Sequence, residues 1–321
     1  MKLDNLYRLI IERGKNADPR GAKEVDKELS RQRTEFKKLS DKEKASFDQE
    51  RLNNPYTDTR ILNGSPDKAI KSMMVGIDID VAELLLADWL SKKGKMVDLV
   101  MSHHPSGRAY ANFYEVMHMQ ADILSHYGVP INVAEGILED RIKQVERKVM
   151  PVNHNRAFDA AQLLDMAFMC VHTPADNHVA TFLQKLMDSK KPERVGDIVD
   201  ILSEIPEYKD AVDNNNAPRL ITGGVKKRAG RIFVDMTGGT EGSVKVFEKL
   251  SQAGVGTIIG MHMSEEHRKN AEKFHINVVV AGHISSDSLG LNLILDEVRK
   301  KDRDIKIIPC SGFRRFERLR K

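Results

Sequence analysis

The chain has 321 residues, of which 31% are charged and 40% hydrophobic, and its formal net charge is +4. This length suffices for about two domains with a large buried core. The small net charge and the aromatic content of 6% exclude a basic, aromatic stripe for nucleic acid, and no apolar run is long enough to span a membrane. We therefore expect a globular protein that binds neither nucleic acid nor membrane.

The two cysteines, Cys170 and Cys310, each lie in or beside an apolar, strand-like run. Without a Cys-x-x-Cys pair, a thiolate zinc site is excluded. Buried, reduced thiols are typical of cytosolic proteins, and the first residues show no apolar signal core. These features predict a cytoplasmic protein.

Residues 1–70 are predicted to form an N-terminal helical extension and a linker. Apolar residues at helical spacing from Val25 to Leu39 predict one helix, and Ser40 with Glu43 has the pattern of a capping box for a second. The narrow apolar stripe favours helices that pack on a neighbour, such as another subunit. Residues 53–67 are rich in turn formers.

Residues 71–215 are predicted to form a first α/β lobe. A strand over 73–79 is followed by a helix that Asp80 and Glu83 cap, and then by a strand over 97–102. This β-α-β order predicts a parallel strand pair with a right-handed crossover. Further helices are expected over 111–127, 133–149, 158–166, 178–187 and 195–205, with a strand over 168–171.

Residues 216–321 are predicted to form a second α/β lobe, because the polar stretch 213–218 marks a boundary after which the alternation restarts. Strands are expected over 232–236, 255–259, 278–281 and 305–308, and helices over 243–250, 264–274 and 289–299. The predicted fold class is thus α/β, with two three-layer lobes and an N-terminal helical extension.

Side chains of metal-ligand type follow three of these predicted strands. They are His103 and His104, then Asp176, and finally His283 with Asp287. Ligand sites of open α/β sheets lie at the carboxyl ends of strands. Two adjacent imidazoles diverge, which suits two ions, and the mixed nitrogen and oxygen set suits Zn, Mn or Fe better than Mg or Ca. The alternative is a histidine pair bonded to backbone and water.

Three other places need weighing. His262, Glu265 and His267 follow the strand 255–259 and are candidate catalytic or proton-relay residues, but a capped, solvent-facing helix start explains them as well. The turn Thr237–Thr240 is either an anion cradle or a tight turn. Arg108 is either a phosphate-neutralising residue or a surface arginine.

Three segments resemble, in order, the motifs of the NIF-three-like family (NGG-one interacting factor three). Asp-Leu-Val-Met-Ser-His-His-Pro at 98–105 resembles its His-His-Pro signature, His-Thr-Pro-Ala-Asp at 172–176 its His-Thr-x-x-Asp, and Ala-Gly-His-Ile-Ser-Ser-Asp at 281–287 its Gly-His-x-x-x-Glu. The resemblance covers about residues 55–310. The chain departs from the family pattern at Asp287, where Glu is usual, and at Gly260-Met261-His262, where Gly-Asp is frequent.

The resemblance implies two α/β lobes with a dinuclear metal centre between them, in a ring-shaped homohexamer. The implied ligands are His103, His104, Asp176, His283 and Asp287, with Asp176 as the bridge. The family is sometimes labelled GTP cyclohydrolase type-1-like, which by resemblance alone suggests nucleotide chemistry.

The predicted function is that of a dinuclear hydrolase for a phosphate ester or nucleotide-type substrate, with two divalent ions (Zn, Mn or Fe) as cofactors. A homo-oligomer, of up to hexamer size, is expected. The alternative function is a non-catalytic, metal-binding oligomeric scaffold or adaptor, which the charged N-terminal helices would suit.

Overall fold

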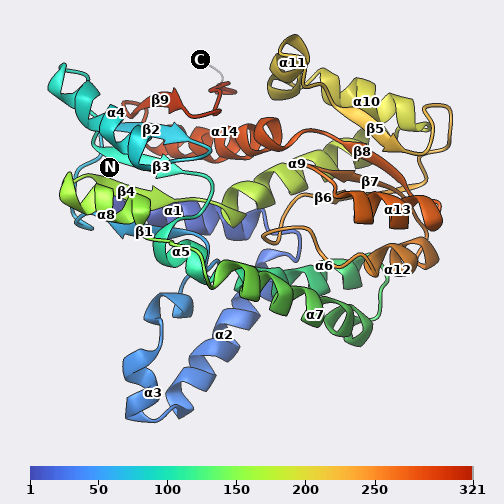
Figure 1. The fold of residues 1–321 in the computed structure, drawn as a ribbon, viewed down its shortest axis with the longest axis horizontal. Coiled ribbons are helices and arrows are strands. Elements are labelled where there is room, and N and C mark those ends of the chain that lie inside the picture. Colours follow the sequence, from blue (N-terminus) through green and yellow to red (C-terminus); the bar gives the residue numbers. More distant parts are fainter. Residues whose placement is uncertain (320–321) are drawn as a thin grey trace.

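The computed structural model describes residues 1–319, and its two sheets form two α/β lobes (Figure 1). The predicted fold class, with N-terminal helices added, is confirmed. The first sheet has the order β1-β4-β3-β2-β9 and the second the order β5-β8-β7-β6. The strands of the first sheet are β1 (Arg60–Asn63), β2 (Ser72–Gly76), β3 (Leu99–Ser102), β4 (Ala167–Cys170) and β9 (Lys306–Cys310). Those of the second are β5 (Arg219–Thr222), β6 (Arg231–Asp235), β7 (Val255–Gly260) and β8 (Asn277–Val280).

The centre of the first sheet is parallel and covered on both faces. Strands β2, β3 and β4 are buried at every residue, as their continuous apolar sequences require. Strand β9 pairs with β2 at the edge of this sheet, where Pro309 is tolerated although it has no N–H to donate. The end of the chain therefore returns to the first sheet, whereas a division at residue 216 places it in the second lobe.

The two lobes repeat one topology. Strand β1 pairs antiparallel with β4, and β5 pairs antiparallel with β8, with a bulge at the corresponding position of each. The sequences from Arg60 and from Arg219 align without a gap as far as the following parallel strand, and each has a glycine with positive φ four residues on, Gly64 and Gly223. Both lobes thus turn the carboxyl ends of their parallel strands toward the same junction.

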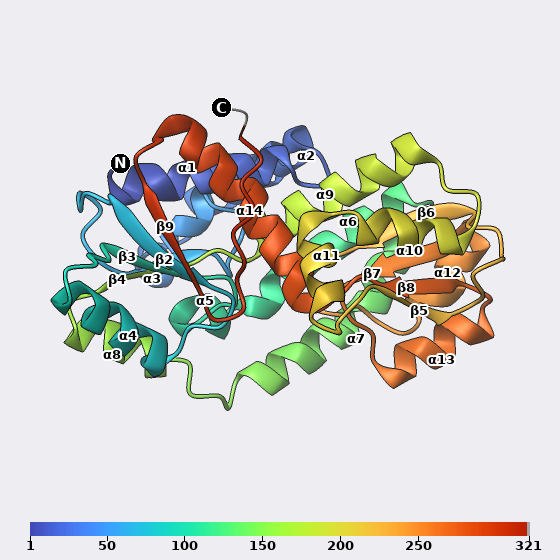
Figure 2. The same cartoon turned by 90° about the horizontal axis from the view of Figure 1, so that it is seen from above.

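Two long helices cross at this junction. Helix α9 (Thr173–Lys190) follows β4 of the first lobe, and α14 (His283–Lys301) follows β8 of the second (Figures 1 and 2). Gly290 of α14 lies against the backbone of α9, so closely that an added Cβ would be 2.4 Å from the carbonyl oxygen of Ala175. The small residue lets both helices begin beside the strand ends that carry the predicted ligands.

Gly290→Ala is expected to destabilise the protein by about 1–3 kcal/mol, because the added methyl group meets backbone that has no room to move. The matched control is Gly136→Ala in α7 (Ile131–Val149), where no atom lies within 4 Å of the added Cβ. That change should stabilise by about 0.5–1 kcal/mol through helix propensity. Urea unfolding midpoints measure both, and equal midpoints for the two variants would refute this account of the crossing.

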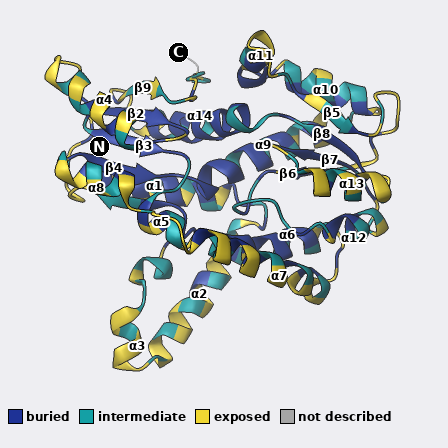
Figure 3. Ribbon diagram, in the orientation of Figure 1, coloured by how far each residue is buried: buried dark blue, intermediate teal, exposed yellow. Residues whose placement is uncertain are grey.

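The N-terminal helices are only partly an extension. Helix α1 (Leu3–Asn16) places Leu3, Leu6 and Ile10 in the core of the first lobe, with no exposed surface. Helices α2 (Ala22–Lys38) and α3 (Asp41–Ser46) project from the body as an arm with mostly exposed residues (Figures 1 and 3). The predicted capping box of Ser40 and Glu43 is confirmed at the start of α3.

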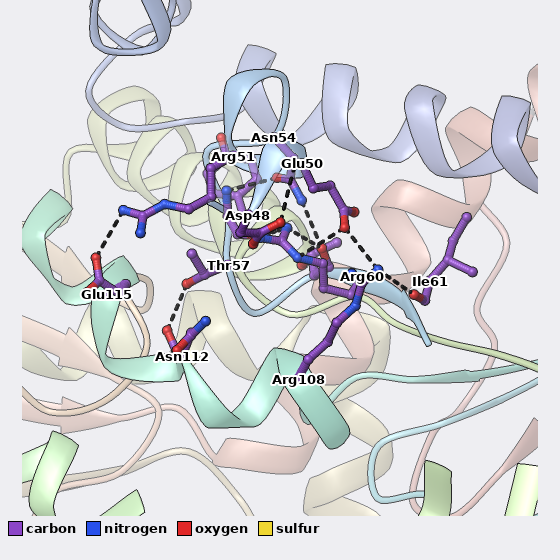
Figure 4. Close-up of polar contacts among 12 residues, drawn as sticks. Asp48, Glu50, Arg51, Asn54, Thr57, Arg60, Ile61, Arg108, Asn112 and Glu115 are labelled. Carbon is purple, nitrogen blue, oxygen red and sulfur yellow. Dashed lines mark hydrogen bonds and ion pairs between the residues drawn. The ribbon is translucent and has the colours of Figure 1, made fainter. Parts of the chain in front are cut away.

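A polar cluster fixes the segment after this arm to the first lobe (Figure 4). The buried Arg60 guanidinium lies 3.0 Å from Asp48 and 3.4 Å from Glu50, which belongs to the 3-10 helix η1 (Gln49–Leu52). Arg108 of α5 (Gly107–Ala111) also pairs with Glu50, at 3.0 Å, and donates to the carbonyl oxygen of Ile61. These contacts of the largely exposed Arg108 favour the surface-arginine interpretation.

The segment predicted as one helix over 111–127 is broken into α5, the 3-10 helix η2 (Phe113–His118) and α6 (Met119–His126). Helices α6 and α7 pack on the second sheet, in one core with Phe233, Ile258 and Val278. The remaining helices are α4 (Val81–Lys92), capped as predicted by Asp80 and Glu83, α8 (Arg156–Leu163), α10 (Val195–Ser203), α11 (Pro206–Asp213), α12 (Val246–Gln252) and α13 (Glu265–Lys273).

Both cysteines are free thiols, with Cys170 buried and Cys310 partly exposed. Among residues 1–319, we find no helix whose length and apolar character would let it cross a membrane.

Candidate metal centre

The five predicted ligands meet at the junction of the two lobes. His103 and His104 directly follow β3, while Asp176 lies in the first turn of α9, after β4. His283 and Asp287 begin α14, after β8, and their spacing of four residues places them on one helix face. Strand ends from both sheets thus supply one cluster, as the strand-end rule predicts.

Asp287 lies at the middle of the cluster and presents one carboxylate oxygen to each side. Its Oδ1 is 3.5 Å from His103 Nε2, which is 3.4 Å from Asp176 Oδ1. Its Oδ2 is 3.5 Å from His104 Nε2 and 3.6 Å from His283 Nε2. The five predicted ligands therefore form two overlapping groups of three, each with atoms within 4.8 Å of one another, and Asp287 belongs to both. A third such group joins His172 to His103 and His104.

Several ligand atoms of this cluster are buried without a hydrogen-bond partner among the described residues. They are His103 Nε2, Asp176 Oδ1 and both carboxylate oxygens of Asp287. Leaving such polar atoms unpaired is costly, and nearly all buried polar groups in proteins are satisfied. Divalent cations would satisfy all four atoms, so the residues present fit a metal centre.

Neighbouring groups favour one orientation of the His103 and His104 rings toward the cluster. His103 Nδ1 lies 3.0 Å from the carbonyl oxygen of Val171 and His104 Nδ1 lies 2.7 Å from Asp78 Oδ1. When Nδ1–H donates to these acceptors, the lone pair of Nε2 points into the cluster, as in many metal-bound histidines.

His172 also lies at the centre, although it is not one of the five predicted ligands. Its ring is 4.8 Å from that of His103, and its Nδ1 is 2.8 Å from the buried Asp58 Oδ2. Thr173 donates its hydroxyl to the same Asp58 oxygen at 2.6 Å. His172 Nδ1 also lies 3.7 Å from Asp176 Oδ2, beyond hydrogen-bond distance, and His172 groups with His103 and His104 as a possible ligand.

Without metal ions, the carboxylates of the cluster favour the protonated form of His103. Burial lowers the pKa of His103, but the carboxylates of Asp287 and Asp176 outweigh burial and hold that pKa well above its usual range. Burial raises the pKa of Asp287, but the charge and hydrogen bond of His103 have the larger effect and hold this pKa below its usual range. Burial, with repulsion from His103, lowers the pKa of His104 to about 4. Metal binding must therefore displace the proton on His103.

The centre opens into a cavity of the second lobe, which His172, His283 and Asp287 line at one end. His262 stands beside the predicted ligands, with its ring 4.9 Å from that of His283 and its Nδ1 3.1 Å from Glu241 Oε1. Burial raises the pKa of Glu241, but the hydrogen bond from His262 and the nearby histidines outweigh it and lower the pKa to about 2. The Glu241 hydrogen bond in turn raises the pKa of His262.

The structure separates the three catalytic candidates. His262 faces the cavity beside the predicted ligands. His267 also lines the cavity, but both ring nitrogens have partners, Ser264 Oγ at 2.6 Å and the carbonyl oxygen of Gly242 at 3.0 Å. Glu265 does not line the cavity and pairs on the surface with Arg268 at 2.8 Å. The position of Glu265 thus agrees with the alternative interpretation, a solvent-facing helix start with surface ion pairs.

The glycine-rich turn after β6 is held by α6. Gln120 Nε2 donates to the carbonyl oxygens of Gly238 and Thr240 at 2.7 and 2.8 Å. Gly238 and Gly239 both have positive φ, and a Cβ at Gly238 would lie 2.7 Å from the Gln120 side chain. This close packing favours the tight-turn interpretation.

Four carboxylates of the site were missed by sequence reasoning. Asp78 follows β2 and Asp235 ends β6, so the strand-end rule that found the histidines applies to them as well. Glu241 has no such signal, and Asp58 precedes the unpredicted strand β1 in a turn-rich segment.

No family sequence model and no curated protein matches the chain. The solved structure of a NIF3 superfamily protein from Sphaerobacter thermophilus is 29% identical, covers 80% of this chain and 92% of that chain, and has a TM-score of 0.71. HcgD from Methanocaldococcus jannaschii is 15% identical, with a TM-score of 0.48, and the match covers 78% of this chain and 87% of that chain. A Bacillus cereus protein related to NIF3 is 10% identical, with a TM-score of 0.44, and the match covers 82% of this chain and 93% of that chain. The likeness to the Sphaerobacter protein and the order of the three motifs both support the resemblance of this chain to the NIF3-like family.

Proposed function

We propose that this protein is a metal-dependent hydrolase that holds two divalent ions and acts on a small molecule in the adjoining cavity. The observation that carries the proposal is the set of buried, unpartnered ligand atoms in two overlapping groups. The imidazole and carboxylate ligands suit Zn, Mn or Fe. A second ion sharing a carboxylate with the first is the arrangement of two-metal hydrolytic sites.

The geometry favours Asp287 as the shared carboxylate. One ion would lie among His103, Asp176 and Asp287, and the other among His104, His283 and Asp287. The resemblance implies Asp176 as the bridge, yet Asp176 Oδ1 faces His103 alone within this set, while Asp287 directs one oxygen to each side. The shorter aspartate thus reaches both groups at the position where glutamate is usual in the family.

The residues beside the ligands suit acid–base catalysis. Ions bound at the centre would lower the pKa of water and polarise a substrate oxygen. Glu241 accepts from His262 Nδ1, which raises the pKa of His262 and leaves Nε2 to hold a proton toward the cavity. His262 is therefore placed to donate a proton to a leaving group, either on a phosphate ester, as the sequence predicts, or on an ester or amide.

His262→Gln is expected to lower kcat by about 10²- to 10⁴-fold, the usual range for loss of a general acid. The metal content should not change, because His262 belongs to neither group of ligands. His118→Gln is the matched control, because His118 is exposed on η2, away from the cavity. Equal kcat values for the two variants would remove His262 from the mechanism.

The hydrolase itself is tested with protein reloaded with Zn, Mn or Fe and assayed against phosphate monoesters, nucleotides, esters, lactones and amides. We expect turnover that His104→Ala abolishes. No turnover with any metal across this panel would contradict the proposal and favour the non-catalytic scaffold. The homo-oligomer implied by the resemblance stays a prediction, which light scattering of the purified protein measures.

A further inference from the structure

The cavity beside the candidate metal centre has an unusual lining for a site that takes phosphates. Part of its lining is apolar, built by Phe233 of β6, Ile258 of β7 and Phe247 of α12, which lie together in one core cluster with residues of α6. Its polar lining consists of acidic, imidazole, hydroxyl and amide side chains. Within residues 1–319, no lysine or arginine lines the cavity.

Asp235 lines this cavity together with the apolar residues and with three of the predicted ligands, Asp176, His283 and Asp287. It ends β6 and alternates with the buried Val234, so its side chain lies on the same face of the sheet as Phe233. The carboxylate has no hydrogen bond or ion pair with any residue of the range 1–319. It is open to the cavity yet surrounded by protein, which raises its pKa to about 6, with a smaller opposing effect from His262.

We propose that this cavity binds a small molecule with an apolar body and a nitrogen group that donates N–H hydrogen bonds to Asp235. An amidine, an amine or the N–H edge of a nitrogen heterocycle would each satisfy the unpaired carboxylate, while the body would lie against Phe233 and Ile258. The inference rests on the proposed function only for the identity of the reacting group, because binding itself requires no turnover.

The same lining disfavours a polyphosphate. A triphosphate would meet Asp235 and Glu241 in a cavity where the described part of the chain offers no cationic side chain other than a protonated histidine. Like charges at short range in a poorly solvated site repel strongly. Arg156, at a second opening near His104, is already paired with Asp80 at 3.1 Å. Any phosphate would therefore depend on the ions alone for its counter-charge.

The test compares dissociation constants by ligand-observed NMR, for the metal-loaded protein and for the same preparation after chelation. Benzamidine and guanosine represent cationic and neutral N–H donors. Benzyl alcohol, phenyl phosphate and GTP are the comparison ligands. In the chelated protein, benzamidine or guanosine should bind at least about 10-fold more tightly than benzyl alcohol, as hydrogen bonds to a charged group allow.

Asp235→Asn and Asp235→Ser should each abolish this preference, while Glu265→Gln, a surface change outside the cavity, should retain it. A preference for benzamidine alone identifies a cation, and one for guanosine alone identifies a neutral heterocycle. GTP should bind chelated protein no more tightly than guanosine. Tighter GTP binding there, or a preference that both Asp235 variants retain, would overturn the inference. None of these binding measurements requires turnover. A protein without catalytic activity would therefore refute the proposed hydrolase function, and the binding comparison would still test the ligand proposal.

Discussion

Asp287→Asn is expected to remove both metal ions, whereas Asp176→Asn is expected to remove only one. Asp287 directs one oxygen to each group of ligands, and Asp176 reaches only the group that contains His103. The amide side chain cannot supply a second anionic oxygen. Elemental analysis should therefore give two ions per chain for the natural protein, about one for Asp176→Asn and none for Asp287→Asn.

The control for this series is Asp304→Asn, because Asp304 is exposed and far along the chain from every ligand. It should retain both ions. Loss of both ions from Asp176→Asn, with one ion kept by Asp287→Asn, would make Asp176 the bridge that the family resemblance implies. The measurement thus separates the geometry of this chain from the pattern carried over from its relatives.

Removing the ions is expected to lower the Tm by roughly 5–10 °C at pH 7.5. The unfolded chain has no assembled site, so two ions, each at 100 times its Kd, together stabilise by about 5.4 kcal/mol. At about 2.1 cal/mol/K of unfolding entropy per residue, each kcal/mol shifts the Tm of a chain of this length by about 1.5 °C. Differential scanning calorimetry before and after chelation measures the effect.

The effect of chelation should shrink as the pH falls. The pKa of His103 in the metal-free folded protein lies above its unfolded value. Its proton therefore stabilises the metal-free protein at acid pH, and this stabilisation is lost as the pH rises through the folded pKa. Metal binding instead requires deprotonated ligands and strengthens with pH. A Tm difference between loaded and chelated protein that is equal at pH 5 and pH 7.5 would contradict this linkage.

Local sequence rules predicted the elements whose signals are local. The capping boxes at Ser40 and Asp80 begin helices where expected, because hydrogen bonds within four residues decide them. Strands β1 and β5 were missed because each has four residues, pairs at a sheet edge and contains a bulge. The return of β9 to the first sheet depends on contacts more than 200 residues apart in sequence, such as Met74 with Ile308, which no local pattern carries.

The residues of the candidate site also fall into those that local sequence patterns predict and those that depend on tertiary contacts. The sequence alone predicts that side chains directly after parallel strands lie close together, because all such strands end at the same edge of a sheet. Asp58 and Glu241 lie on irregular segments, and their hydrogen bonds to His172 and His262 depend on tertiary packing. Glu265 was placed in the site by sequence proximity alone, and helix α13 carries it to the surface.

The most direct test is an anomalous difference map from crystals of the metal-loaded protein, collected at the absorption edge of the bound metal. Two peaks about 3.5–4 Å apart, with one oxygen of Asp287 next to each, are the predicted result. A single peak, or peaks that lie away from Asp287, would contradict the claim that strand ends of both lobes build one dinuclear centre.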